Sequence, residues 1–168
     1  MAGALSERIV SRLDEAARLY NRLVLVVGPT GSGKTRALRE VGNRIGAMPI
    51  NVGLTLTERM LEFTERQRIL KLPTTLAGIV MESGSDVVLL DNLEALFDAT
   101  LRQDPMRMLK DMSKNQTIVA AWSGTLEGDY LTYADPEHPD YRRYGLDGIF
   151  IETTNVAAQL SKRMKGTE

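Results

Sequence analysis

The chain has 168 residues, a length typical of one domain. It contains no cysteine and a single histidine, His138, which excludes disulfides, thiol nucleophiles and zinc sites built from cysteine or several histidines. Its net charge of −1 argues against a nucleic-acid-binding polycation. The charge is uneven, because residues 1–84 carry +4 and residues 85–168 carry −5, which hints at head-to-tail self-association.

No apolar run approaches the ~18 residues of a membrane span. The first ten residues, MAGALSERIV, are polar and amphipathic, unlike a signal peptide. We therefore expect a cytoplasmic protein without membrane contacts. We expect three parts, namely an N-terminal helix leading into the core (1–22), a core (23–154) and a short C-terminal helix or tail (155–168).

Five short apolar runs predict strands that are buried on both faces of a sheet. They alternate with helical segments, which indicates a parallel sheet in an α/β sandwich. The strands are expected at residues 23–27, 49–52, 87–90, 117–122 and 149–151.

Helical spacing and helix-end signals predict the segments between the strands. Ser6 is expected to cap the first helix, Thr55 and Glu58 to form a capping box, and Asp104 to cap a helix that begins with proline. Pro73 is expected to break its helical region. The expected helices cover residues 6–21 and 34–45, a helix from 55 to the break at 73, a second piece from there to about 82, and helices that begin near 104 and 155. Residues 123–147 are expected to be rich in turns.

The strongest motif is GPTGSGKT at residues 28–35, which matches G-x-x-x-x-G-K-[ST] between a buried strand and a helix. Its backbone amides and the helix N-terminus can hold phosphates. Lys34 should reach the β- and γ-phosphates, and the Thr35 hydroxyl should bind Mg²⁺. The expected nucleotide contacts are Gly28, Pro29, Thr30, Gly31, Ser32, Gly33, Lys34, Thr35 and Arg36.

A second motif, VVLLD, ends at Asp91. Its four apolar residues form the third expected strand, so the carboxylate should face the phosphate site and hold Mg²⁺ through water. The alternative is that Asp91 only caps the next helix.

The residue after Asp91 departs from the usual pattern of P-loop ATPases, in which a glutamate orients the attacking water. Here it is Asn92, whose amide can hydrogen-bond water but cannot take its proton. Glu94 is a candidate replacement, or else a solvated helix residue. The sequence therefore predicts nucleotide binding with weak or conditional ATP hydrolysis.

Other site candidates follow the later strands. Ser123, with Thr117 as a weaker choice, could sense the γ-phosphate, although Ser123 also suits a turn before glycine. Arg142 and Arg143 lie where related ATPases place an arginine finger that reaches a neighbouring subunit, or they form a solvated pair stacked on tyrosines.

Three further features have weaker functional interpretations. The tripeptide at residues 20–22 precedes the first strand, where P-loop ATPases often contact adenine. Trp122 fits the core better than a base contact, and His138 fits a loop.

Beyond the P-loop, the chain resembles the small P-loop protein of BREX bacteriophage-exclusion systems. The similarity spans about residues 20–151 and rests on a few segments rich in distinctive residues. These are TERQRILKLP (64–73), LDNLEALF (90–97), QDP (103–105), LTYADPEHP (131–139) and YRRY (141–144).

This resemblance implies an AAA+-like ATPase core with strand order 5-1-4-3-2, bound to ATP and Mg²⁺. It also implies homo-oligomerisation, other BREX subunits as partners, and contact with DNA, either direct or through those partners. Residues 28–35 would hold phosphate, Asp91 the metal, and Arg142 or Arg143 the finger. Few residues follow the fifth strand, so a C-terminal lid domain is not expected.

Two other functions compete with this interpretation. The first is a small-molecule P-loop kinase, which would need an acceptor site after the second strand, where Gly53 and its neighbours offer no acid. The second is a nucleotide-bound scaffold without hydrolysis, which Asn92 permits.

Overall fold

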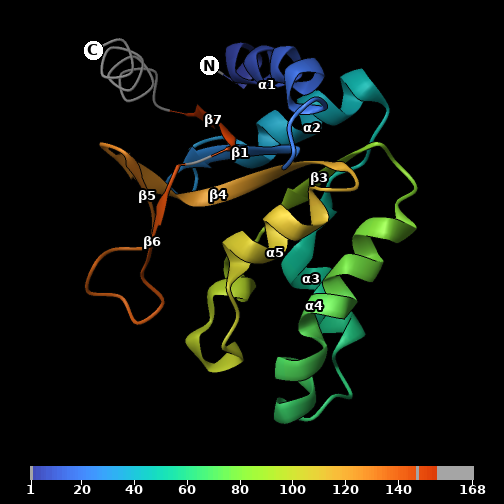
Figure 1. Cartoon of the computed structure of the whole chain (residues 1–168), viewed down its shortest axis with the longest axis vertical. Helices are drawn as coiled ribbons and strands as arrows, with labels where there is room; N and C mark the ends of the chain where they lie inside the picture. Colours follow the sequence, from blue (N-terminus) through green and yellow to red (C-terminus); the bar gives the residue numbers. More distant parts are fainter. Residues whose placement is uncertain (1, 147, 155–168) are drawn as a thin grey trace.

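The computed structural model describes residues 2–146 and 148–154, with side chains from Leu5 onward. Its centre is a sheet of five parallel strands in the order β2-β3-β4-β1-β7 (Figure 1), which is the predicted order read from the other edge. The strands are β1 (Leu23–Gly28), β2 (Ile50–Asn51), β3 (Val87–Asp91), β4 (Thr117–Glu127) and β7 (Phe150–Thr153).

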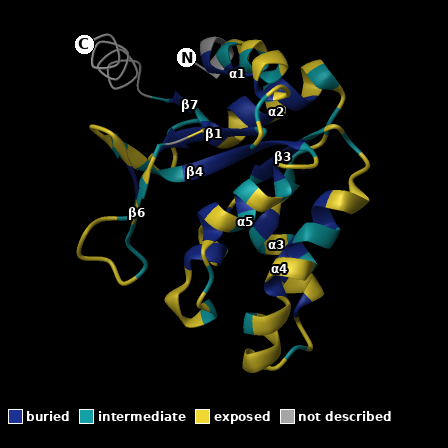
Figure 2. Cartoon of the chain, viewed as in Figure 1, coloured by how far each residue is buried: buried dark blue, intermediate teal, exposed yellow. Residues whose placement is uncertain are grey.

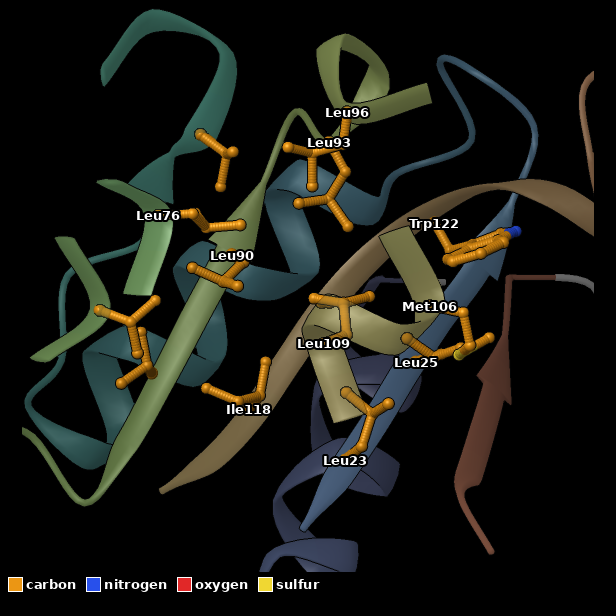
Figure 3. Close-up of a cluster of buried hydrophobic side chains, with 14 of the residues drawn as sticks. Leu23, Leu25, Leu76, Leu90, Leu93, Leu96, Met106, Leu109, Ile118 and Trp122 are labelled. Atoms are coloured by element: carbon orange, nitrogen blue, oxygen red, sulfur yellow. The ribbon is translucent and has the colours of Figure 1, made fainter. Parts of the chain in front are cut away.

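Helices cover both faces of this sheet, because successive side chains of a strand point to opposite faces. On one face, Val24 and Val26 of β1 pack against α1 (Ala2–Ala16) and α2 (Lys34–Ile45). On the other, Leu23 and Leu25 pack in a larger core (Figures 2 and 3). That core includes residues of α3 (Val52–Arg59), α4 (Glu65–Glu82), the 3₁₀ helix η1 (Glu94–Phe97) and α5 (Pro105–Met112).

The helix α4 continues through Pro73, so the expected break there is wrong. A proline inside a helix leaves the carbonyl four residues earlier without its usual donor. That carbonyl belongs to Ile69, and the side-chain amide of Gln103 donates a 2.9 Å hydrogen bond to it. Gln103 thus compensates for the missing backbone donor, and α4 runs unbroken for 18 residues.

Two other helix starts differ from expectation. Ser6 is buried inside α1, which ends at Ala16 and not at residue 21, so it does not cap the helix. The capping box at Thr55 is also wrong, because α3 begins earlier and Asn51 caps it by accepting from Leu54 N at 3.0 Å. Asp104 caps α5 as expected, accepting from the Arg107 amide at 3.2 Å.

Residues 123–147 were expected to be rich in turns, but the described part up to residue 146 also contains strands. The strand β4 continues to Glu127 and pairs antiparallel with β5 (Tyr130–Tyr133), which pairs with β6 (Arg142–Gly145). Aromatic packing holds this extension on the core, because the Tyr133 ring stacks on Phe97 at 3.6 Å between centroids.

An ion cluster joins α1 to β7. The Glu152 carboxylate is almost fully buried and accepts from Arg8 Nε and Arg12 Nε, each at 3.0 Å. Arg8 also donates to the Thr153 carbonyl. The fifth strand is therefore fixed from both sides, by β1 in the sheet and by α1 above it. The helix expected from residue 155 lies outside the described residues, and no helix in the described part is long and apolar enough to cross a bilayer.

Candidate phosphate-binding site

The loop between β1 and α2 lies at the carboxyl edge of the parallel sheet, where open α/β folds bind ligands. Gly31 and Gly33 adopt left-handed backbone angles, with φ of 79° and 102°, that other residues rarely adopt. A side chain at Gly28 would collide with Thr154, which follows β7. These glycines therefore let the loop turn tightly and let its backbone approach a bound group.

Lys34 is the central cation of the site. It is 7% exposed, and its Nζ donates to the carbonyl oxygens of Gly28 at 2.8 Å and Pro29 at 2.7 Å. Burial lowers the pKa of this ammonium, while the negative charges of Glu94 and Asp91 act in the opposite direction. The ammonium thus lies at the loop, close to two carboxylates and partly withdrawn from water.

The loop opens onto a cleft of about 960 Å³. It brings together the P-loop, the carboxyl ends of β2 and β3, Ser123 in the middle of β4, and the outward face of α2. The lining residues are Thr30, Gly31, Gly33, Lys34, Thr35, Arg36, Arg39, Asn43, Ala47, Met48, Pro49, Asn51, Asp91, Asn92, Glu94 and Ser123.

Asn92 is a structural connector within this cleft. It has a left-handed φ of 57°, and its backbone amide donates to Asp91 Oδ1 at 2.9 Å. Its side-chain amide donates to Asn51 Oδ1 at 2.9 Å, and its carbonyl accepts from Gly53 N. Asn92 therefore joins the end of β3 to the start of α3, and its side chain is engaged there.

Glu94 and Ser123 meet across the cleft. Ser123 Oγ donates to Glu94 Oε1 at 2.7 Å, although the two residues are 29 positions apart. In the sheet, Ser123 is also the register partner of Gly28. The candidate base and the candidate γ-phosphate sensor are thus in direct contact, beside the P-loop.

The two arginines of β6 are not among the residues lining this cleft. Arg143 lies with its guanidinium 3.7 Å from the centre of the Tyr130 ring, and Arg142 donates to the Tyr141 carbonyl. Stacking of Arg143 on a tyrosine was one expected alternative, although Tyr130 belongs to the adjacent strand. Within one copy the pair does not reach the candidate phosphate site.

Three weaker candidates lie elsewhere. Residues 20–22 precede β1, at the end of the sheet opposite the P-loop, and Arg22 N donates to the Ser113 carbonyl. They are not among the residues that line this cleft, and their contact with adenine stays a prediction. Thr117 begins β4 at that same far end and is buried. Trp122 is fully buried and donates to the Thr132 carbonyl, as expected of a core residue.

The sequence reasoning missed Asn51, Arg39, Asn43 and Met48, all of which line the cleft. Asn51 could have been found, because it is a polar residue at the carboxyl end of a parallel strand, and open α/β sheets bind ligands at that edge. The α2 residues gave no such signal, since exposed arginines on a helix are common.

The residues present suit a triphosphate with Mg²⁺. Ser32 Oγ is buried and makes no hydrogen bond within the described residues, which leaves a donor for a phosphate oxygen. The carbonyls that hold Lys34 could release it to an anion. Thr35 and Asp91 supply the hydroxyl and carboxylate oxygens that Mg²⁺ prefers, and both line the cleft.

The parallel sheet, the glycine-rich loop before α2 and the acid at the end of β3 define a P-loop domain of the nucleoside-triphosphate-binding class. The family model "ATPase family associated with various cellular activities (AAA)" matches residues 24–166, and the chain therefore belongs to the AAA family. A search of curated proteins gave no significant match.

Solved structures of similar arrangement include PCH-2 from C. elegans, at 18% identity and a TM-score of 0.48, covering 90% of this chain and 43% of that one. A DNA replication initiation factor is similar at 17% identity and a TM-score of 0.47, and the match covers 95% of this chain and 47% of that one. AMPPCP-bound DnaA from Aquifex aeolicus is similar at 16% identity and a TM-score of 0.44, and the match covers 95% of this chain and 49% of that one. The chain thus spans less than half of each of these structures.

Proposed function

We propose that this AAA-family chain is an ATP-binding, oligomerising subunit whose ATP hydrolysis is slow or depends on partners. The observation that carries the proposal is the placement of Lys34 in a glycine-rich loop that faces Asp91, Glu94 and Ser123 across one cleft. The loop amides and the N-terminus of α2 would hold the triphosphate.

In this proposal the polar and charged residues of the loop and of β3 contact the triphosphate or its metal. Lys34 exchanges its carbonyl partners for the β- and γ-phosphates. Thr35 and Asp91 hold Mg²⁺, which supplies charge neutralisation at the phosphates. Ser32 donates to a phosphate oxygen, and Arg36 lies at the first turn of α2, beside the same loop.

Glu94 is the candidate general base, because it is the carboxylate other than Asp91 among the lining residues of the described cleft, and Asn92 cannot accept a proton. Ser123 holds one Glu94 oxygen and leaves the other for a water. The basic side chains that line the described cleft are Lys34 and the arginines of α2. In this proposal Arg142 or Arg143 of a neighbouring copy would therefore supply the arginine finger.

The biological setting that we propose is a bacterial anti-phage complex of the BREX type. Support comes from the segments that resemble the small P-loop protein of those systems, notably residues 90–97 and the Tyr-rich region up to 144. Other subunits of that complex would be its partners, and DNA would be contacted directly or through them. The asymmetric charge of the two halves is consistent with self-assembly.

The test is a calorimetric titration with a non-hydrolysable ATP analogue and Mg²⁺. Lys34→Ala should abolish binding, whereas Lys110→Ala on α5, away from the cleft, should bind as the wild type does. Light scattering with and without the analogue then measures assembly. Binding by Lys34→Ala with wild-type affinity would refute the assignment of the site.

One observation favours a second candidate, a nucleotide-bound scaffold that does not hydrolyse ATP. Asn92 occupies the usual position of the catalytic glutamate and is held by Asn51. Single-turnover phosphate release, measured with the partner subunits present, separates this scaffold from a conditional ATPase. Release above the rate in buffer identifies the ATPase.

A further inference from the structure

The cleft extends well past the P-loop. Beyond Thr35 it continues along the outward face of α2 to the loop that leads into β2. We call Arg36, Arg39, Asn43 and Met48 the α2 wall, since these four cleft residues lie on that helix and the loop after it. This wall provides a binding surface at the far end of the cleft from Glu94 and Ser123.

The α2 wall carries positive charge that is weakly compensated. Arg39 is exposed and makes no ion pair or hydrogen bond within the described ranges. Arg36 has one partner on its own helix, Glu40, at 3.5 Å, and its side chain is 77% exposed. An anionic partner could therefore contact both guanidinium groups without breaking a strong internal contact.

A segment with the opposite charge lies between β5 and β6. Residues 134–141 include three acidic and no basic residues. We call residues 134–141 the acidic loop, which protrudes from the body of the molecule (Figure 1). Asp135 and Glu137 are exposed there and have no ion-pair partner in the described part of the chain.

The acidic loop is braced, so docking it costs little ordering entropy. The His138 amide donates to the Asp135 carbonyl, and the Tyr141 amide donates to the His138 carbonyl. At its end, Asp140 accepts from the Ala99 amide at 3.0 Å. That contact places the loop next to η2 (Ala99–Leu101), on the face of the sheet opposite α2.

We propose that the acidic loop of a second copy of this chain docks on the α2 wall, with its Asp135 and Glu137 facing Arg36 and Arg39. The inference rests on the proposed function and specifies which surfaces meet at the nucleotide. Because the two surfaces lie on opposite faces of one copy, the contact is head-to-tail and can repeat around a ring.

This docking also gives the β6 arginines a route to the site. The acidic loop leads directly into Arg142 and Arg143, so a copy docked through this loop carries both residues to the edge of its neighbour's cleft. A second copy is the occupant that the chain itself supplies, because its acidic loop has the charge opposite to that of the exposed Arg36 and Arg39.

The test uses charge reversal with full-length variants, saturating ATP analogue and sedimentation velocity. Arg39→Glu, and separately the double variant Asp135→Lys with Glu137→Lys, should each weaken self-association at least tenfold. Combining all three substitutions in one chain should restore association by swapping the charges. Arg66→Glu, an exposed arginine on α4, is the matched control and should associate as the wild type does.

A mixing experiment tests the head-to-tail geometry. Arg39→Glu retains an intact acidic loop, and the loop variant retains an intact α2 wall, so an equimolar mixture should form a complex that neither forms alone. Unchanged association of either single-surface variant, or absence of association in the mixture, overturns the inference. So does a wild-type chain that binds nucleotide and stays monomeric.

Calorimetry on the same samples separates this inference from the proposed function. The loop variant should bind the ATP analogue with wild-type affinity while its association is lost. No binding by the wild type would refute the proposed function instead. Loss of affinity for a short DNA duplex in Arg39→Glu, with unchanged self-association, would assign the α2 wall to nucleic acid and overturn the inference.

Discussion

Ser123 at the carboxyl end of the core sheet donates a 2.7 Å hydrogen bond to Glu94, the first residue of η1. This contact fixes one oxygen of the only carboxylate in the described cleft other than Asp91. A base that is held on one side by a hydroxyl keeps a defined direction for its second oxygen. Substitutions of Glu94 and Ser123 therefore test whether Glu94 accepts the proton of the attacking water.

Glu94→Gln should lower the rate of ATP cleavage by about 10²–10⁴-fold, the usual contribution of a general base. Nucleotide affinity should remain at the wild-type value, because glutamine preserves shape and accepts the Ser123 hydrogen bond. Single-turnover cleavage measures the rate, and calorimetry measures the affinity. Cleavage at the wild-type rate would exclude Glu94 as the base.

Ser123→Ala should have a smaller effect than Glu94→Gln. Glu94 keeps its charge in this variant but loses its positioning partner, so we expect about tenfold slower cleavage, comparable with the loss of one hydrogen bond of about 1.4 kcal/mol. Ser123→Thr retains the hydroxyl and serves as the rescue variant. A Thr variant as slow as the Ala variant would argue against a role for the hydrogen bond.

Asn92→Glu should not produce a fast ATPase. Glutamate at a left-handed φ costs about 1 kcal/mol, and loss of the donor to Asn51 costs about 1 kcal/mol more. Urea unfolding should therefore show a stability loss of about 1–2 kcal/mol, without a gain in turnover. Asn92→Gly, which accepts the backbone angle and removes only the side chain, should lose about half as much.

Gln103 and Pro73 should be energetically coupled. Gln103→Ala leaves the Ile69 carbonyl without a donor and should cost about 1 kcal/mol of unfolding free energy. In a Pro73→Ala background the backbone amide of residue 73 can donate to the Ile69 carbonyl. Gln103→Ala should then lower the free energy of unfolding by clearly less. A double-mutant cycle by urea denaturation measures the difference, and equal costs in both backgrounds would contradict the coupling.

Tyr133 and Tyr144 should ionise at a higher pH than an exposed tyrosine does. Burial raises the pKa of Tyr133 to about 12, with the charges of Glu94 and Asp140 adding to the effect, and burial likewise raises the pKa of Tyr144 to about 12. Because the unfolded value is near 10, this contribution to stability is complete below pH 10 and is lost as the pH rises toward 12. Phenolate absorbance should therefore show a late phase that the Tyr133→Phe, Tyr144→Phe double variant lacks.

Local signals predicted most of the central architecture. The apolar runs predicted the five parallel strands, and the P-loop motif and Asp91 were expected to share one site and do line one cleft, since each pattern depends on adjacent residues. The cap at Asp104 followed from Asp-Pro for the same reason. Asn92 departs from the usual motif, but its hydrogen bond to Asn51 joins the turn after β3 to the end of β2 and could not be predicted from either segment alone.

The errors share one physical cause, which is the dependence on distant partners. Pro73 stays in α4 because Gln103, 30 residues later in the chain, supplies a donor. β5 and β6 form because Tyr133 stacks on Phe97, although their sequence is rich in turn-forming residues. The burial of Glu152 depends on arginines of α1 about 140 residues earlier, and no local pattern signals it.

The position of Trp122 gives this protein a built-in optical probe. It is the sole tryptophan of the chain, it adjoins Ser123, and its ring contacts Phe97 edge-on at 5.0 Å between centroids. Any shift of η1 or of the end of β4 alters the surroundings of that indole. Emission from the unlabelled polypeptide can therefore report, in real time, a rearrangement at this edge of the candidate phosphate-binding cleft.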